Sequence, residues 1–283
     1  MKRQPDPCSQ TRVSMHGFSS VAASRRSFMV RAAGLAGAAA VPWRAWGQSG
    51  EAALLLMAGA GYRRPMEAIC AAFTQETGVA VERSYGNLQQ VFSQARASGR
   101  VDVLVGDTDF IDRARDLKLP GRLTLGEGIM VLGWRRGLAV RAELAGHEGV
   151  RSLLAMPGLS VAMPNPQQAV YGHAARQWLQ AQQLWAPLQD RLKVVGTVPQ
   201  VSAYLGSGQV DLGFMNLTEA LALGDQLGGY VRVPPGEGSY APIEIVAALP
   251  EADAHPATRA AREGLAAFLR GAKAQDLLRR AGL

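Results

Sequence analysis

The chain has 283 residues, enough for one large domain or two of medium size. Its hydrophobic content of 48% and charged content of 19% describe a globular protein and exclude a disordered one. The net charge of +7 is concentrated at the N-terminus, because residues 1–47 hold seven of the 30 basic and one of the 23 acidic residues. The remainder therefore has 23 basic and 22 acidic residues, a balance of +1, which gives no support for nucleic-acid binding.

The N-terminal segment has the features of an export signal. Arg25 and Arg26 precede an alanine- and glycine-rich run, Ala32–Val41, which is too short to span a bilayer comfortably. Small residues then precede a cleavage site that we place near Gly47 or Gln48. The paired arginines resemble a twin-arginine signal. We therefore expect export by the twin-arginine machinery and a periplasmic location.

After the signal, the chain opens with a strand, a glycine turn and a helix. Leu54–Met57 is a short apolar strand, and Gly59 and Gly61 permit a tight turn. Pro65 suits the first turn of the helix that follows. Such an arrangement places unpaired N–H groups at the carboxyl end of a sheet, where a small anion or polar ligand can bind. The alternative is an ordinary connection between a strand and a helix.

Two more strand and helix units follow. We predict strands over Val79–Tyr85 and Val101–Val105, each followed by a helix, Leu88–Ser98 and Phe110–Leu117. Asp109 is the expected N-cap of the second helix. This β-α order, three times over, predicts a mostly parallel sheet covered by helices.

A second set of elements repeats this logic. Its predicted strands are Gly128–Trp134, Ser160–Met163, Leu192–Val195 and Val210–Met215. An extended segment, Tyr240–Leu249, and two helices end the chain. The predicted division is a signal over 1–47, lobe 1 over 48–127 and 240–283, and lobe 2 over 128–239. A cleft between two such lobes is a common site for small ligands, and such lobes often close by a hinge motion.

Three segments carry a family resemblance. Val161–Ala175 joins a strand, an Asn-Pro loop and a Tyr-Gly helix start, and Thr197–Phe214 and Phe268–Leu283 follow at matching separations. Together they resemble the periplasmic molybdate-binding proteins of ABC transporters, within the type 2 solute-binding superfamily. The resemblance covers nearly all of residues 53–283. It implies a two-lobed α/β fold in which each lobe is a mostly parallel sheet flanked by helices.

The resemblance also implies a set of ligand contacts, which this chain keeps only in part. In the family, two serine hydroxyls and a tyrosine contact the oxyanion, and their matching positions here are Gly61, Leu88 and Asn216. Main-chain N–H groups at Tyr171 and Val198 can be kept by any side chain. Three side-chain donors are therefore replaced.

Other polar groups near these loops are candidate replacements. The amides of Asn87 and Asn216 can donate hydrogen bonds, and Tyr62, Arg63 and Arg64 lie beside the first loop. A hydrogen bond to a charged group is worth roughly 1.5–3 kcal/mol, so either the lost donors are replaced or the ligand is not molybdate. The predicted ligand-binding residues are Gly61, Tyr62, Asn87, Leu88, Tyr171, Val198 and Asn216.

The resemblance implies a monomeric binding protein that captures molybdate or tungstate and delivers it to an inner-membrane ABC permease. No cofactor, catalytic residue or direct protein ligand to a metal is expected. Two alternatives stay open: a sensor or accessory protein for another small anion or organic solute, and a periplasmic enzyme. The sequence has no Gly-x-Ser-x-Gly, His-Glu-x-x-His or phosphate-binding lysine motif, which argues against the enzyme.

Overall fold

Two five-stranded sheets organise the computed structural model of this chain, which describes residues 53–140, 144–251 and 254–283. All of the described residues belong to one compact unit. The predicted export signal and its cleavage site lie outside the described residues. Within the described ranges, no helix is both long and apolar enough to cross a membrane.

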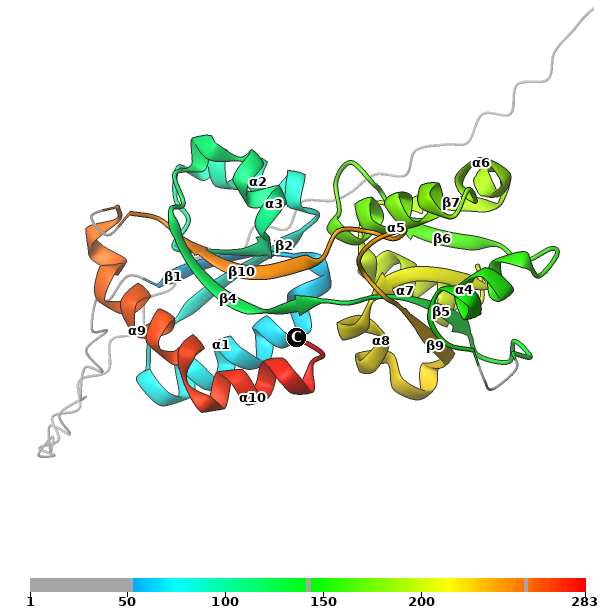
Figure 1. The fold of residues 1–283 in the computed structure, drawn as a ribbon. Helices are drawn as coiled ribbons and strands as arrows, with labels where there is room; N and C mark the ends of the chain where they lie inside the picture. Colours follow the sequence, from blue (N-terminus) through cyan, green and yellow to red (C-terminus); the bar gives the residue numbers. More distant parts are fainter. Residues whose placement is uncertain (1–52, 141–143, 252–253) are drawn as a thin grey trace, which may run out of the picture. The chain divides into compact units, whose positions relative to one another are not determined.

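The first sheet defines lobe 1. Its strand order is β2 (Val81–Gly86), β1 (Leu54–Gly59), β3 (Val103–Asp107), β10 (Ile243–Leu249) and β4 (Gly121–Gly128). Its helices are α1 (Arg63–Thr77), α2 (Leu88–Ser98), α3 (Thr108–Arg113), α9 (Arg259–Arg270) and α10 (Ala272–Arg280). Helices α1, α9 and α10 cover one face of this sheet, and α2 and α3 cover the other (Figure 1).

The second sheet defines lobe 2. Its strand order is β7 (Leu192–Val195), β6 (Val161–Pro164), β8 (Leu212–Asn216), β5 (Met130–Arg135) and β9 (Leu227–Val233). Its helices are α4 (Gly146–Ala155), α5 (Val170–Ala181), α6 (Trp185–Leu188), α7 (Val198–Gly206) and α8 (Leu217–Leu223). Helices α7 and α8 pack on each other, while α5 packs on β5, β6 and β8.

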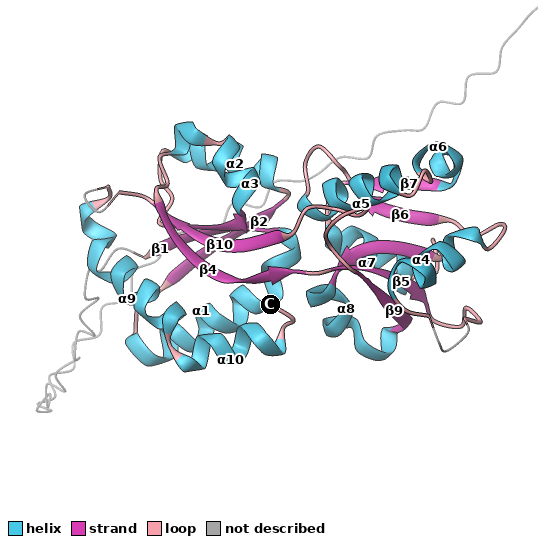
Figure 2. Ribbon diagram, in the orientation of Figure 1, coloured by secondary structure: helices cyan, strands magenta, loops and turns pink. Residues whose placement is uncertain are grey.

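The two sheets share one topology, and the predicted two-lobed α/β fold is confirmed. In lobe 1, β1 is parallel to β2 and β3, and β10 is antiparallel to both β3 and β4. In lobe 2, β6 is parallel to β7 and β8, and β5 is antiparallel to β8 and β9. In each sheet, four of the five strands therefore run in the same direction (Figure 2). The remaining strand, β10 in lobe 1 and β5 in lobe 2, is antiparallel to its neighbours.

The chain crosses between the lobes twice, and a tyrosine joins the two crossings. It passes from β4 to β5 at Ile129 and returns between β9 and β10. The buried hydroxyl of Tyr240 accepts a hydrogen bond from the N–H of Met130 at 3.1 Å and donates to the carbonyl of Val233 at 2.8 Å. These two bonds hold the crossings side by side.

Some predicted elements were wrong in detail. The strand predicted over Gly128–Trp134 begins too early, because Gly128 is the last residue of β4, the chain changes lobes at Ile129 and the second strand, β5, begins at Met130. The N-cap of α3 is Asp107, whose side chain accepts from the N–H of Phe110 at 3.1 Å, and not Asp109. Asp109 instead lies in the first turn of the helix.

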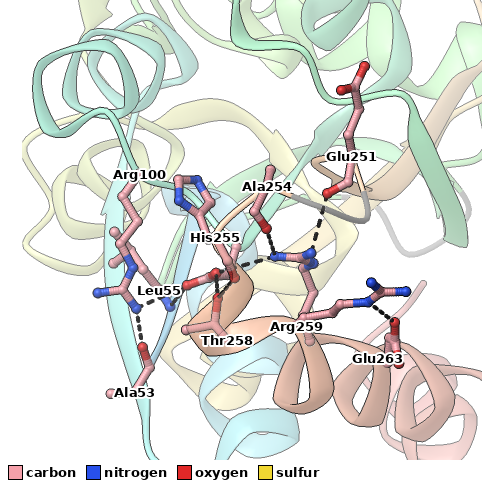
Figure 3. A network of polar contacts seen from close by, with 11 residues as sticks. Ala53, Leu55, Arg100, Glu251, Ala254, His255, Thr258, Arg259 and Glu263 are labelled. Carbon is pink, nitrogen blue, oxygen red and sulfur yellow. Dashed lines mark hydrogen bonds and ion pairs between the residues drawn. The ribbon is translucent and has the colours of Figure 1, made fainter. Parts of the chain in front are cut away.

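A buried aspartate anchors the outer end of lobe 1. Asp102 is fully buried and accepts hydrogen bonds from the N–H of Leu55 at 2.8 Å and from the side chain of Arg100 at 3.0 Å. The hydroxyl of Thr258, just before α9, also donates to this carboxylate (Figure 3). Asp102 therefore joins β1 and the start of β3 to the C-terminal helices.

Lobe 2 repeats this anchor. Asp211 precedes β8 as Asp102 precedes β3. Its carboxylate accepts from the N–H of Ser160, before β6, at 2.9 Å and from the side chain of Arg135 at 2.7 Å. Both aspartates therefore hold the ends of neighbouring strands together at a distance from the other lobe.

Candidate functional site

The carboxyl ends of the parallel strands of both lobes meet around one small cavity. Its volume is about 30 Å³. The lining residues are Gly59, Ala60, Gly61, Tyr62, Gly86, Asn87, Leu88, Ala169, Val170, Tyr171, Thr197 and Val198. A larger groove of about 390 Å³ lies between the end of α2 and Pro250, but its walls come from lobe 1 alone. Only the small cavity, of these two, can be gripped by both lobes.

Three helices begin at this cavity, one from lobe 1 and two from lobe 2. They are α2 at Leu88, α5 at Val170 and α7 at Val198. The first N–H groups of a helix have no acceptor within the helix and carry a partial positive charge. At α5, the N-cap is Ala169, which has no side-chain acceptor to cap these groups. The start of α5 therefore presents hydrogen-bond donors suited to an anion, whereas capping boxes at Asn87 and Thr197 satisfy some of the N–H groups of α2 and α7.

Gly172 lets α5 come close to the strand that precedes it. A Cβ atom at this position would lie 2.3 Å from the carbonyl oxygen of Pro164 and 2.6 Å from that of Asn165. Only glycine allows this approach of backbone to backbone. The Tyr-Gly pair at the helix start therefore positions the main chain of Tyr171 at the cavity.

Two tyrosine hydroxyls meet across the lobes. The hydroxyl of Tyr62, after β1, donates to that of Tyr171, on α5, at 3.2 Å, and both side chains are buried. Burial raises the pKa of both phenols above its ordinary value, and the charge of Asp107 raises them further. Both hydroxyls are therefore neutral hydrogen-bond donors at physiological pH.

The two asparagines predicted to contact ligand donate to protein groups. The amide of Asn87 donates to the side chain of Gln168, in lobe 2, at 3.2 Å. The amide of Asn216 donates to the carbonyl of Gly61, in lobe 1, at 2.9 Å, and its oxygen caps α8 by accepting from the N–H of Glu219. In this arrangement both amides join the lobes.

The structure brings six of the seven predicted residues together around the cavity. Asn216 is fully buried behind the wall, beside Gly61. A Cβ atom on Gly61 would lie 3.1 Å from the Asn216 amide nitrogen, so a serine there would require this side chain to shift. The guanidinium of Arg63, which follows Tyr62 in the chain, lies over the ring of Tyr85 in its own lobe, with its Cζ atom 5.7 Å from the ring centroid. Binding roles for these seven residues stay a prediction.

Leu88 places an apolar side chain where the family resemblance implies a hydroxyl. It is buried, and its Cδ2 atom lies 3.7 Å from a Cβ built on Gly59 and 3.0 Å from one built on Gly106. Its N–H donates to the carbonyl of Gln168 across the lobes at 3.1 Å. Leu88 therefore fills space next to the cavity and provides no side-chain donor.

A buried carboxylate that the sequence reading had not assigned to the site lies close by. Asp107 is the last residue of β3, at the carboxyl end of the strand. Gly61 and Asn87, which were predicted to bind ligand, lie at the carboxyl ends of the neighbouring strands β1 and β2. Asp107 and Val170 share a second cavity, of about 70 Å³, and Val170 lines both cavities. Burial raises the pKa of Asp107 to about 6. A carboxylate here opposes a nearby anion when it is ionised.

Metal coordination has no support in the described residues. No group of three or more His, Cys, Asp or Glu side chains within them is arranged to hold a metal ion. His173 is instead placed edge-on to Phe110, with ring centroids 6.1 Å apart. The donors at the cavity are N–H and hydroxyl groups, which suit the oxygen atoms of an anion.

Comparisons with known proteins agree with this geometry. The family model for bacterial extracellular solute-binding proteins matches residues 54–283. The molybdate-binding protein ModA of Azotobacter vinelandii is 27% identical over 228 residues, which are 79% of this chain and 86% of that protein. The solved structure of the A. vinelandii periplasmic molybdate-binding protein, also 27% identical, superposes with a TM-score of 0.68. It covers 81% of this chain and 97% of that one.

More distant structures share the fold and bind different solutes. The sulfate-binding protein SubI from Mycobacterium tuberculosis H37Rv is 19% identical, with a TM-score of 0.63 over 81% of this chain and 85% of that one. A periplasmic thiamin-binding protein is 15% identical, with a TM-score of 0.65 over 83% of each chain. The resemblance predicted from the sequence is thus confirmed, while these two neighbours identify the fold alone.

The raised pKa of Asp107 predicts a pH-dependent effect of Asp107→Asn. The folded state holds this proton up to about pH 6, whereas an unfolded aspartate loses it near 3.9. The stability that the protonated form provides is therefore complete below about pH 4 and is lost as the pH rises through about 6. Asparagine mimics the protonated side chain and can still cap α3.

We expect Asp107→Asn to leave the free energy of unfolding nearly unchanged at pH 4 and to raise it by roughly 2 kcal/mol at pH 8. Urea unfolding at the two pH values measures this difference. Asp109→Asn, at an exposed site on the same helix, is the control. An equal effect of Asp107→Asn at both pH values would contradict the account.

Proposed function

This chain belongs to the family of bacterial extracellular solute-binding proteins, and from that premise we propose that it captures a small oxyanion, molybdate or tungstate, between its lobes. The observation that carries the proposal is the convergence of α2, α5 and α7 on one cavity. Helix starts from both lobes can hold one anion only when the lobes are together. Binding and closure are then coupled, as expected for a protein that signals its loaded state.

The size of the cavity favours an ion over an organic solute. A single water molecule needs roughly 10–15 Å³, so a volume of about 30 Å³ has room for very few atoms. A compact anion needs only a small separation of the walls. A solute the size of thiamin would require the lobes to move much further apart.

The donors available to such an anion are mainly main-chain groups. The N–H groups of Tyr171 and Val198 lie in the first turns of α5 and α7 and are the positions matched to the family. The hydroxyls of Tyr62 and Tyr171 can turn from each other toward an oxygen atom. Together these donors replace part of what the two serine hydroxyls supply in the family.

The cellular setting of the proposal comes from the sequence. A twin-arginine signal would export the chain to the periplasm, where it would act as a monomer without a cofactor. The lobes, once closed on the anion, would dock on the permease of an ABC transporter. Catalysis has no part in this function, because capture and delivery leave the ligand unchanged.

One specific observation keeps a second ligand class in view. Gly61 and Leu88 bring no hydroxyl to the cavity, and the carboxylate of Asp107, which lines the neighbouring cavity, opposes a dianion when it is ionised. The same site can therefore serve a different small anion or an organic solute, in a sensor or accessory protein. Ligand screening distinguishes the two.

The first test is a thermal-shift screen of the processed protein, residues 48–283, against molybdate, tungstate, sulfate, phosphate and small carboxylates. A ligand at 100 times its Kd adds about 2.7 kcal/mol of stability, which raises Tm by about 5–10 °C in a protein of this size. We expect molybdate and tungstate to give this shift and sulfate not to do so. A shift with another anion alone would assign the site to the second ligand class.

The second test restores a hydroxyl at the start of α2. Leu88→Ser and Leu88→Ala lose similar packing, but only serine can donate to the anion. Because a hydrogen bond to a charged group contributes roughly 1.5–3 kcal/mol, we expect Leu88→Ser to bind molybdate at least about tenfold more tightly than Leu88→Ala. Isothermal titration calorimetry measures the ratio. Equal affinities would mean that the anion does not lie at the start of α2.

A further inference from the structure

A buried carboxylate of lobe 2 takes its cationic partner from lobe 1. Glu219, in the first turn of α8, is 2% exposed. Its Oε2 atom accepts a hydrogen bond from the hydroxyl of Ser202, on α7, at 3.2 Å. Its Oε1 atom accepts from the Nε of Arg64, in the first turn of α1, at 3.3 Å. Glu219 is therefore hydrogen-bonded within its own lobe but neutralised from the other.

The Arg64–Glu219 pair lies next to the cavity and is held by residues of the same helices and loops that form the cavity wall. Ser202 is on α7, which begins at the cavity with Val198. Asn216 caps the same turn of α8 that holds Glu219 and also donates to the carbonyl of Gly61. Two contacts, Arg64 with Glu219 and Asn216 with Gly61, thus join the starts of α1 and α8 behind the site.

We propose that Arg64 and Glu219 form an electrostatic latch between the lobes, which stabilises the closed conformation and so sets the affinity for the ligand. Moving the lobes apart breaks the pair. Of the described side-chain partners of the Glu219 carboxylate, only the neutral hydroxyl of Ser202 then remains. The latch acts on closure and makes no contact with the ligand. Its effect on affinity rests on the proposed function, whereas its effect on the distance between the lobes does not.

The strength of the latch follows from its exposure. The Arg64 side chain is 54% exposed and that of Glu219 is 3% exposed, so the pair is intermediate between a surface and a buried ion pair. Because only the closed conformation binds tightly, apparent affinity falls with the closed fraction. We expect Arg64→Ala to weaken binding about five- to tenfold, mainly through faster release.

The neighbouring arginine provides a matched control. Arg63 is in the same turn of α1, and its guanidinium lies over the ring of Tyr85, in its own lobe, at 5.7 Å from the ring centroid. Arg63→Ala removes the same charge from nearly the same place. Both variants therefore lose the same long-range attraction for an anion, and only Arg64→Ala loses the contact between lobes.

Two readouts test the latch. The first is the Kd of each variant for molybdate, or for whichever anion of the screen stabilises the wild type. The second is the distance between spin labels at Arg115→Cys in lobe 1 and Gln180→Cys in lobe 2, both exposed, measured without added anion. We expect Arg64→Ala to change both, Arg63→Ala to stay within twofold of wild type in Kd, and Arg64→Ala with Glu219→Gln to recover part of the loss.

The outcomes separate the two proposals. If Arg63→Ala and Arg64→Ala weaken binding equally, or if Arg64→Ala leaves the label distances of the wild type unchanged, the latch is overturned. If no anion of the screen binds the wild type, the proposed function fails, and the label distances still decide the latch. A double variant weaker than Arg64→Ala alone would also contradict it, because the neutral side chain that Glu219→Gln introduces no longer needs a cation.

Discussion

The first N–H groups of α2, α5 and α7, which have no acceptor within their own helices, are the constraint on which the site depends. Each of these groups needs an acceptor, and a helix start that is buried without one is costly. In lobe 1, Leu88 satisfies its N–H with a carbonyl of lobe 2. In lobe 2, residues at the starts of α5 and α7 line the cavity, Tyr171 and Val198 among them. A carbonyl of the opposite lobe and an oxygen atom of a bound anion can thus both serve as acceptors for the N–H groups at the helix starts.

The contacts between the lobes suggest a physical reason for Gly61 and Leu88, which stand where the family resemblance implies serines. Gly61 leaves room for the Asn216 amide, which bonds the Gly61 carbonyl and caps α8. Leu88 fills apolar space that a serine would leave open. At Gly61 the interaction is therefore made with a side chain of the opposite lobe, and at Leu88 it is apolar packing within lobe 1. A protein built this way is expected to close readily and to grip its ligand through the main chain.

The repeated topology was predictable from the sequence, because apolar runs and glycine or proline residues mark its strands and turns. Leu192–Val195 was predicted with the bounds that the structure gives it. Two elements, α4 and β9, were not predicted even though glycine and proline residues lie in or beside them. The strand β4 was also missed, and its last residue, Gly128, was assigned to the strand that is β5.

The candidate site was predictable as a set of loops, but the partners of its side chains were not. Sequence position placed six residues at the cavity because each of them follows one of the parallel strands of its own sheet. It could not show that the amides of Asn87 and Asn216 bond the opposite lobe, since the partners lie 81 and 155 residues away. Competition between a helix cap, a lobe contact and a ligand is settled only in three dimensions.

The central claim is that a small oxyanion binds where the helices of both lobes begin. Crystals of the processed protein soaked or grown with tungstate test it most directly, through the anomalous scattering of tungsten. We expect one strong peak between the lobes, with oxygen atoms within hydrogen-bonding distance of the N–H groups of Tyr171 and Val198. A well-ordered crystal with no peak there, or with its only peak on the outer surface of a lobe, would contradict the claim.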